Sequence, residues 1–143
     1  MSSRDTKFSW IQLPAAMKSL DKFRYFVLQE AEKVSLPAKK SDKIELILEE
    51  VLLNIINYAY SPDEQAYIDI GCKITPDNLF CIRVQDRGIP FNPLTQEAPQ
   101  LEEDIEKRQV GGLGIFLAKQ MADSLDYHYK DGNNILDIGL YLA

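Results

Sequence analysis

Three polar side chains recur along one strongly apolar stretch of the sequence, residues 44–60. Glu50, Asn54 and Asn57 are separated by steps of four and three residues, so in a helix they lie above one another on one stripe. An amide oxygen is a hard ligand of the kind that Mg²⁺ binds, and a carboxylate one turn earlier can take the proton of an attacking hydroxyl. The pattern favours a polar site at Glu50 and Asn54, whereas solvent exposure is the simpler interpretation of Asn57.

A carboxylate with a different setting ends the alternating run at residues 79–86. Asp86 continues the row that contains Phe80, Ile82 and Val84, which is predicted to be buried. A carboxylate there is costly unless it is paired or lies at a pocket mouth. It could accept a hydrogen bond from the exocyclic amine of adenine, and Gly88 would let the backbone approach closely. Taken alone, Asp-x-Gly at a strand end is most often a turn.

The third candidate is a glycine cluster, Gly111-Gly112-x-Gly114, directly before a helical pattern. Backbone N–H groups in such a loop can bind phosphate at the positive end of a helix. Because no Gly-Lys-Ser/Thr follows, the loop is not a Walker A motif, and because no strand directly precedes it, it is not a Rossmann loop. On its own, such a cluster is often only a helix cap.

The elements that must position these residues follow from hydrophobic periodicity. Helical spacing covers 15–34, 44–60 and 115–124, and Ser41 is the expected N-cap of the second helix. Alternation predicts a strand at 6–13 and two β-hairpins, 67–74 with 79–86 and 125–130 with 135–142. This order predicts an α+β two-layer sandwich, with an antiparallel or mixed sheet and helices on one face. Regular βαβ alternation is absent, which argues against a doubly wound parallel sheet.

Bulk properties exclude several classes of protein. The chain of 143 residues is long enough for one domain, and its net charge of −6 argues against a nucleic-acid or membrane-surface protein. No stretch has the pattern of a signal peptide or a membrane span. Two cysteines and one histidine are too few for a disulfide scaffold, and zinc would need carboxylate ligands that no spacing suggests. By strand parity Cys72 and Cys81 face opposite sides, so we expect no bond between them and a reduced, cytoplasmic protein.

The order and spacing of the three motifs together resemble the GHKL ATPases, the superfamily of DNA gyrase, histidine kinases and MutL. Residues 50–59 resemble the N box, residues 86–91 the first glycine box and residues 111–114 the second. The resemblance runs from Pro14 to the C-terminus. The compact length and the form Asp-x-Gly-x-Pro-Phe-Asn-Pro are similar to one branch, the anti-sigma factor serine/threonine kinases of bacterial partner switching.

That resemblance implies a Bergerat fold that binds Mg²⁺ and ATP, formed by a single domain over 1–143 with a lid loop at about 92–111. It implies a kinase that phosphorylates a serine or threonine of a STAS-domain anti-sigma antagonist, binds a sigma factor and forms a homodimer. By position, Asn54 matches the Mg²⁺ ligand, Glu50 the catalytic base and Asp86 the adenine-binding aspartate.

The remaining matches are the glycines of the phosphate loop and lid, Gly88, Gly112 and Gly114. The predicted lid is acidic, so Lys107 or Arg108 would have to supply positive charge for ATP. Two alternatives stay open. One is a non-catalytic nucleotide-binding module that regulates by partner docking. The other is the ATP-binding half of a histidine kinase whose phosphoacceptor lies on another chain.

Overall fold

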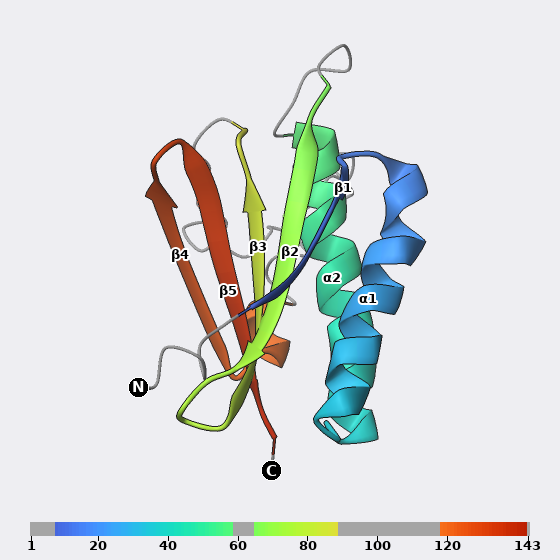
Figure 1. The fold of residues 1–143 in the computed structure, drawn as a ribbon, viewed down its shortest axis with the longest axis vertical. Helices are drawn as coiled ribbons and strands as arrows, with labels where there is room; N and C mark the ends of the chain where they lie inside the picture. Colours follow the sequence, from blue (N-terminus) through green and yellow to red (C-terminus); the bar gives the residue numbers. More distant parts are fainter. Residues whose placement is uncertain (1–7, 59–64, 89–117, 143) are drawn as a thin grey trace, which may run out of the picture.

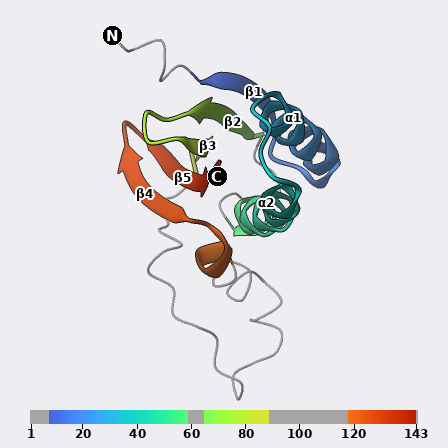
Figure 2. The same ribbon diagram turned by 90° about the horizontal axis from the view of Figure 1, so that it is seen from below.

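Two long helices lie on one face of a five-stranded sheet (Figure 1). This computed structural model describes residues 8–58, 65–88 and 118–142. Helix α1 spans Leu20–Lys33, after a short 3-10 turn at Met17–Ser19, and helix α2 spans Ala38–Tyr58. Seen from below, both helices pack against the same side of the strands (Figure 2). The predicted α+β two-layer sandwich is confirmed.

The sheet has the strand order β1-β2-β3-β5-β4, and every neighbouring pair is antiparallel. The strands are β1 (Ser9–Pro14), β2 (Tyr67–Ile74), β3 (Leu79–Asp86), β4 (Ser124–Lys130) and β5 (Asn133–Tyr141). Both predicted hairpins, β2–β3 and β4–β5, are present. Because β5 pairs with β3, the second hairpin brings Asn134 directly opposite Asp86.

Helix α2 begins three residues before its predicted N-cap, so the prediction of Ser41 as the cap is wrong. The carbonyl of Pro37 accepts hydrogen bonds from the N–H groups of Lys40 (2.9 Å) and Ser41 (3.0 Å), which closes the first turn early. Proline suits a helix start because it fixes φ near the helical value and has no N–H to satisfy there. The predicted end of the helix, near residue 60, lies outside the described residues.

The predicted helix over 115–124 ends earlier than expected. Its described part is helical only over 118–121, and Ser124 already belongs to β4. The N–H of Asp123 donates to the carbonyl of Gly139 (2.9 Å), so pairing with β5 begins where the helical pattern was expected to continue. The sheet partner supplies the hydrogen bonds that another helical turn would have formed.

The turn of the second hairpin is shorter than the predicted cluster at 131–134. Asp131 and Gly132 both have positive φ, 53° and 81°, as a two-residue type I′ turn requires. Asn133 and Asn134 therefore belong to β5. The tighter turn moves Asn134 from an expected surface loop into the sheet.

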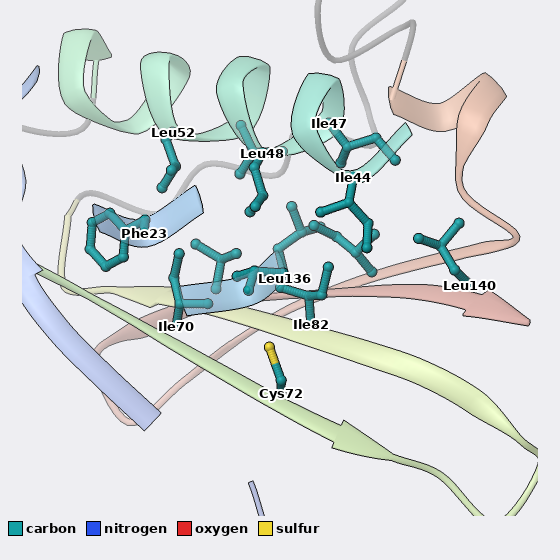
Figure 3. Close-up of a cluster of buried hydrophobic side chains, with 14 of the residues drawn as sticks. Phe23, Ile44, Ile47, Leu48, Leu52, Ile70, Cys72, Ile82, Leu136 and Leu140 are labelled. Atoms are coloured by element: carbon teal, nitrogen blue, oxygen red, sulfur yellow. The ribbon is translucent and has the colours of Figure 1, made fainter. Parts of the chain in front are cut away.

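The core lies between the helices and the inner face of the sheet (Figure 3). Phe23 of α1, Ile44 and Leu48 of α2, and Ile70 and Ile82 of the sheet are each at most 1% exposed. Burying one such side chain contributes roughly 1.5–3 kcal/mol, so this layer holds α2 firmly on the sheet.

Both cysteines are free and buried, and they belong to different faces of the sheet. Cys72 lies in the core cluster, whereas Cys81 lies outside that cluster. The prediction that they form no bond is confirmed. None of the described helices combines the length and apolar character that a membrane crossing requires.

Candidate functional site

The three polar side chains of the α2 stripe differ in their exposure to solvent. Asn54 is 6% exposed, Glu50 is partly exposed, and Asn57 is exposed. Asn54 follows Val51 by three residues and Ile47 by seven, so it shares the helix face that packs on the sheet. The simpler interpretation holds for Asn57, while Asn54 is a buried polar group that needs a physical explanation.

The side-chain amide of Asn54 forms no hydrogen bond with any other residue in the described part of the chain. A buried polar group without a partner costs about 1–3 kcal/mol, so such groups are rare unless a ligand or water completes them. An amide oxygen is a hard donor, and Mg²⁺ binds few protein ligands while phosphate oxygens and water fill its remaining positions. The buried, unpaired Asn54 amide therefore fits a Mg²⁺–nucleotide ligand.

Glu50 lies one turn before Asn54 on the same helix. Burial is the main cause that raises the pKa of its carboxyl group, and the charge of the neighbouring Glu49 raises it further. A carboxylate with a raised pKa accepts a proton more readily than an ordinary surface glutamate. Glu50 could therefore accept a proton from a group that lies near Asn54.

Asp86 ends β3 on the core-facing side and is 6% exposed. Its Oδ1 accepts hydrogen bonds from the N–H of Gly88 (2.7 Å) and from Nδ2 of Asn134 (3.2 Å). The bond to Gly88 closes an Asx turn, so Asp86-x-Gly88 is a turn as well as a buried carboxylate. These two donors offset the cost of burying the carboxylate.

Asn134 and Tyr127 were missed by the sequence analysis. Asn134 also donates to the carbonyl oxygen of Gly88 (3.3 Å), and the hydroxyl of Tyr127 donates to Oδ1 of Asn134. Counting back by twos along β5, from Ile138 through Leu136, would have placed Asn134 in the buried row. Because Gly132, Asn133 and Asn134 have the composition of a turn, Asn134 was assigned to the turn rather than to the strand.

The two halves of the candidate site come from facing layers. The C-terminal half of α2, which carries Asn54, lies at the same end of the molecule as the end of β3, which carries Asp86 (Figure 1). The other predicted site residues lie outside the described residues: Lys107, Arg108, Gly112 and Gly114. So does the expected lid at 92–111. Among the described residues, no three His, Cys, Asp or Glu side chains gather to hold a metal.

Residues 13–140 match the sequence profile of the histidine kinase-like ATPase domain family. The chain belongs to this family. The match spans the helices and the sheet that carry Glu50, Asn54 and Asp86. Membership in an ATPase family implies that ATP is the nucleotide used.

Similar proteins carry kinase names. The chain is 25% identical over 130 residues to serine-protein kinase RsbW of Listeria innocua, covering 88% of this chain and 82% of that protein. It is 26% identical over 137 residues to serine-protein kinase RsbW of Oceanobacillus iheyensis, covering 93% and 85%. It is 28% identical over 98 residues to serine/threonine-protein kinase BtrW of Bordetella bronchiseptica, covering 68% of each.

Two solved structures share the fold. One contains the RsbU and RsbW domains of a Mycobacterium tuberculosis protein, with a TM-score of 0.66 and 15% identity over 95% of this chain and 32% of that one. The other is the histidine kinase domain of a blue-light activated kinase from Erythrobacter litoralis, with a TM-score of 0.56 and 16% identity over 91% and 62%. The resemblance inferred from the three motifs is confirmed.

Proposed function

We propose that the protein is an ATP-dependent serine/threonine kinase that acts as an anti-sigma regulatory factor and phosphorylates a STAS-domain antagonist. The observation that carries this proposal is the buried Asn54 amide, which has no hydrogen-bond partner in the described chain, one turn after a glutamate of raised pKa. The kinase names of its relatives support the same reaction class.

In this proposal Glu50 is the general base. The hydroxyl oxygen of the substrate serine or threonine attacks the γ-phosphorus of ATP while Glu50 accepts the hydroxyl proton. The bond between that phosphorus and the β–γ bridging oxygen breaks, and ADP leaves with the electron pair. Phosphoryl transfer depends mainly on positioning and charge neutralisation, so a base of this kind contributes about 10²–10⁴-fold.

Asn54 would hold Mg²⁺ through its amide oxygen. When bound, this ion neutralises charge on the phosphate oxygens. Asp86 would accept a hydrogen bond from the exocyclic amine of adenine, next to the turn at Gly88. By the family resemblance, Gly112 and Gly114 would belong to the phosphate loop and lid, and Lys107 or Arg108 would supply positive charge.

We also propose that residues 1–143 act as one ATP-binding domain, and that the protein forms a homodimer and binds a sigma factor. Phosphorylation of the antagonist would leave the sigma factor bound to the kinase, whereas unphosphorylated antagonist would release it. The family resemblance supports these partners.

The test is incubation of the protein with γ-labelled ATP, Mg²⁺ and a STAS-domain protein encoded beside it. We expect label on the STAS protein. Glu50→Gln should retain nucleotide binding and lose transfer by about 10²–10⁴-fold, because the amide cannot accept the proton. A matched control is Glu45→Gln, an exposed glutamate of the same helix, which should transfer at the wild-type rate.

Two outcomes would argue against the proposal. Undiminished transfer by Glu50→Gln would remove Glu50 from the mechanism. Tight ATP binding without labelling of any cognate STAS protein would favour the alternative, a non-catalytic nucleotide-binding module that acts by partner docking.

A further inference from the structure

A chain of hydrogen bonds runs from β4 through β5 to the carboxylate at the end of β3. Tyr127 bonds to Oδ1 of Asn134, and Nδ2 of Asn134 bonds to Oδ1 of Asp86 at 3.2 Å. Asn134 is 7% exposed, and Tyr127 packs at the edge of the core. The three residues belong to three adjacent strands, so the sheet itself holds them in line.

The groups around Asp86 determine which atom donates and which accepts in each hydrogen bond of this series. The amide group of Asn134 faces two acceptors there, Oδ1 of Asp86, which also accepts the N–H of Gly88, and the carbonyl of Gly88. Neither group can donate, so the NH₂ of Asn134 must point towards them. The amide oxygen then faces Tyr127, whose hydroxyl must donate. Tyr127 therefore opposes any flip of the Asn134 amide.

These hydrogen bonds determine how the carboxyl group of Asp86 can interact with a ligand. Its Oδ1 accepts one hydrogen bond from the backbone N–H of Gly88 and one from Nδ2 of Asn134, and these two bonds hold the carboxyl group in one orientation. An ionised carboxylate only accepts hydrogen bonds. It therefore matches a base edge that offers an amine, as adenine does, and it opposes one that offers a carbonyl oxygen, as guanine does.

We propose that Tyr127 and Asn134 are positioning residues that set the preference of this site for adenine over guanine nucleotides. The inference rests on the proposed nucleotide site and adds two residues to it. Asn134 keeps the carboxyl group of Asp86 oriented, and Tyr127 acts through Asn134.

The first test compares ATP and GTP affinities of the full chain by calorimetry with Mg²⁺. Tyr127→Phe keeps the ring and removes only the hydroxyl. We expect it to weaken ATP binding about 3- to 10-fold, the loss of one ordinary hydrogen bond, and to leave GTP binding nearly unchanged. The matched control is Tyr129→Phe, the same change on an exposed tyrosine of the same strand, which should leave both affinities unchanged.

The second test varies pH and follows the ratio of ATP to GTP affinity as well as ATP affinity, because a purely structural defect would weaken the binding of both nucleotides alike. In Asn134→Asp two carboxylates share one site, so one of them keeps a proton to a higher pH than usual. The protonated form imitates the amide donor. The ATP affinity of this variant, relative to the wild type, should therefore fall as pH rises from about 6 to about 8.

The outcomes of these tests distinguish a failure of the positioning role from a failure of the proposed kinase function. An unchanged ratio of ATP to GTP affinity in Tyr127→Phe, or a flat pH profile in Asn134→Asp, overturns the positioning role alone if the wild type binds ATP. A wild-type protein that binds no ATP overturns the proposed function and this inference together.

Discussion

Asn54 lies one helical turn after Glu50 on α2, yet the two side chains differ in their access to water. The Asn54 amide is 6% exposed and has no hydrogen-bond partner in the described residues, whereas Glu50 stays partly exposed. A shielded amide thus lies one helical turn from a carboxylate that water can reach. This difference in exposure leads to separate predictions for the two residues.

Replacing Asn54 with an apolar residue should raise the stability of the fold and abolish nucleotide binding. Asn54→Leu replaces an unpaired buried amide with an apolar side chain of similar size, so we expect the free energy of unfolding to rise by about 1–2 kcal/mol. Urea denaturation measures this change. The same variant should lose Mg²⁺-dependent ATP binding in calorimetry. Asn57→Leu, on the exposed side of the helix, should alter neither quantity, and a less stable Asn54→Leu would show that the amide has a structural partner.

The rate of phosphoryl transfer should depend on pH through Glu50. Only the ionised carboxylate can accept a proton, so transfer should decline as pH falls through the raised pKa of Glu50. Glu49→Gln removes the second cause of that shift, so its acid limb should lie at lower pH than in the wild type. Initial rates across pH give the comparison. An acid limb that does not move would show that Glu49 has no influence on the base.

Stability should also depend on the protonation of Glu50. Because its pKa is higher in the folded than in the unfolded state, the unfolded chain releases this proton first as pH rises. Stability is therefore lost between the unfolded and the folded pKa. Glu50→Gln, which cannot titrate, should be more stable than the wild type near pH 7 and should lose that advantage near about pH 3. Thermal melts at the two pH values test this sign.

Gly71 lies directly opposite Trp10 in the β1–β2 register, and the indole ring covers it. A Cβ at position 71 would stand 2.8 Å from Cε3 of Trp10. Gly71→Val should therefore destabilise the fold by about 1–3 kcal/mol, although valine normally favours a strand. In a Trp10→Ala background the same change should cost much less. An equal cost in both backgrounds would show that the ring is not the obstacle.

The two cysteines should resist modification while the protein is folded. Burial is the main cause that raises the pKa of both thiols, that of Cys81 to about 11, and only the thiolate reacts. After iodoacetamide treatment at about pH 8, intact mass should show no adduct in the native protein and two adducts in denaturant. Rapid native alkylation of Cys81 would indicate that this face of the sheet opens in solution.

Much of the fold follows from local periodicity. The apolar spacing over 44–60 predicted the helix that α2 forms, and the alternation of β2 and β3 predicted strands at 67–74 and 79–86, as observed. Parity along β3 also placed Asp86 in the buried row. These signals are local because side-chain direction repeats every 3.6 residues in a helix and every two in a strand.

The tertiary structure decided what local signals left open. Competition between helical and sheet hydrogen bonds set the start of β4 at Ser124, and the two-residue turn moved Asn134 into β5. The pairing of β5 with β3 then placed Asn134 against Asp86, 48 residues apart in sequence. The sequence determined which residues are polar and which row each occupies. Strand order and register between distant segments decided which of them meet, because those depend on packing across the whole sheet rather than on neighbours in the chain.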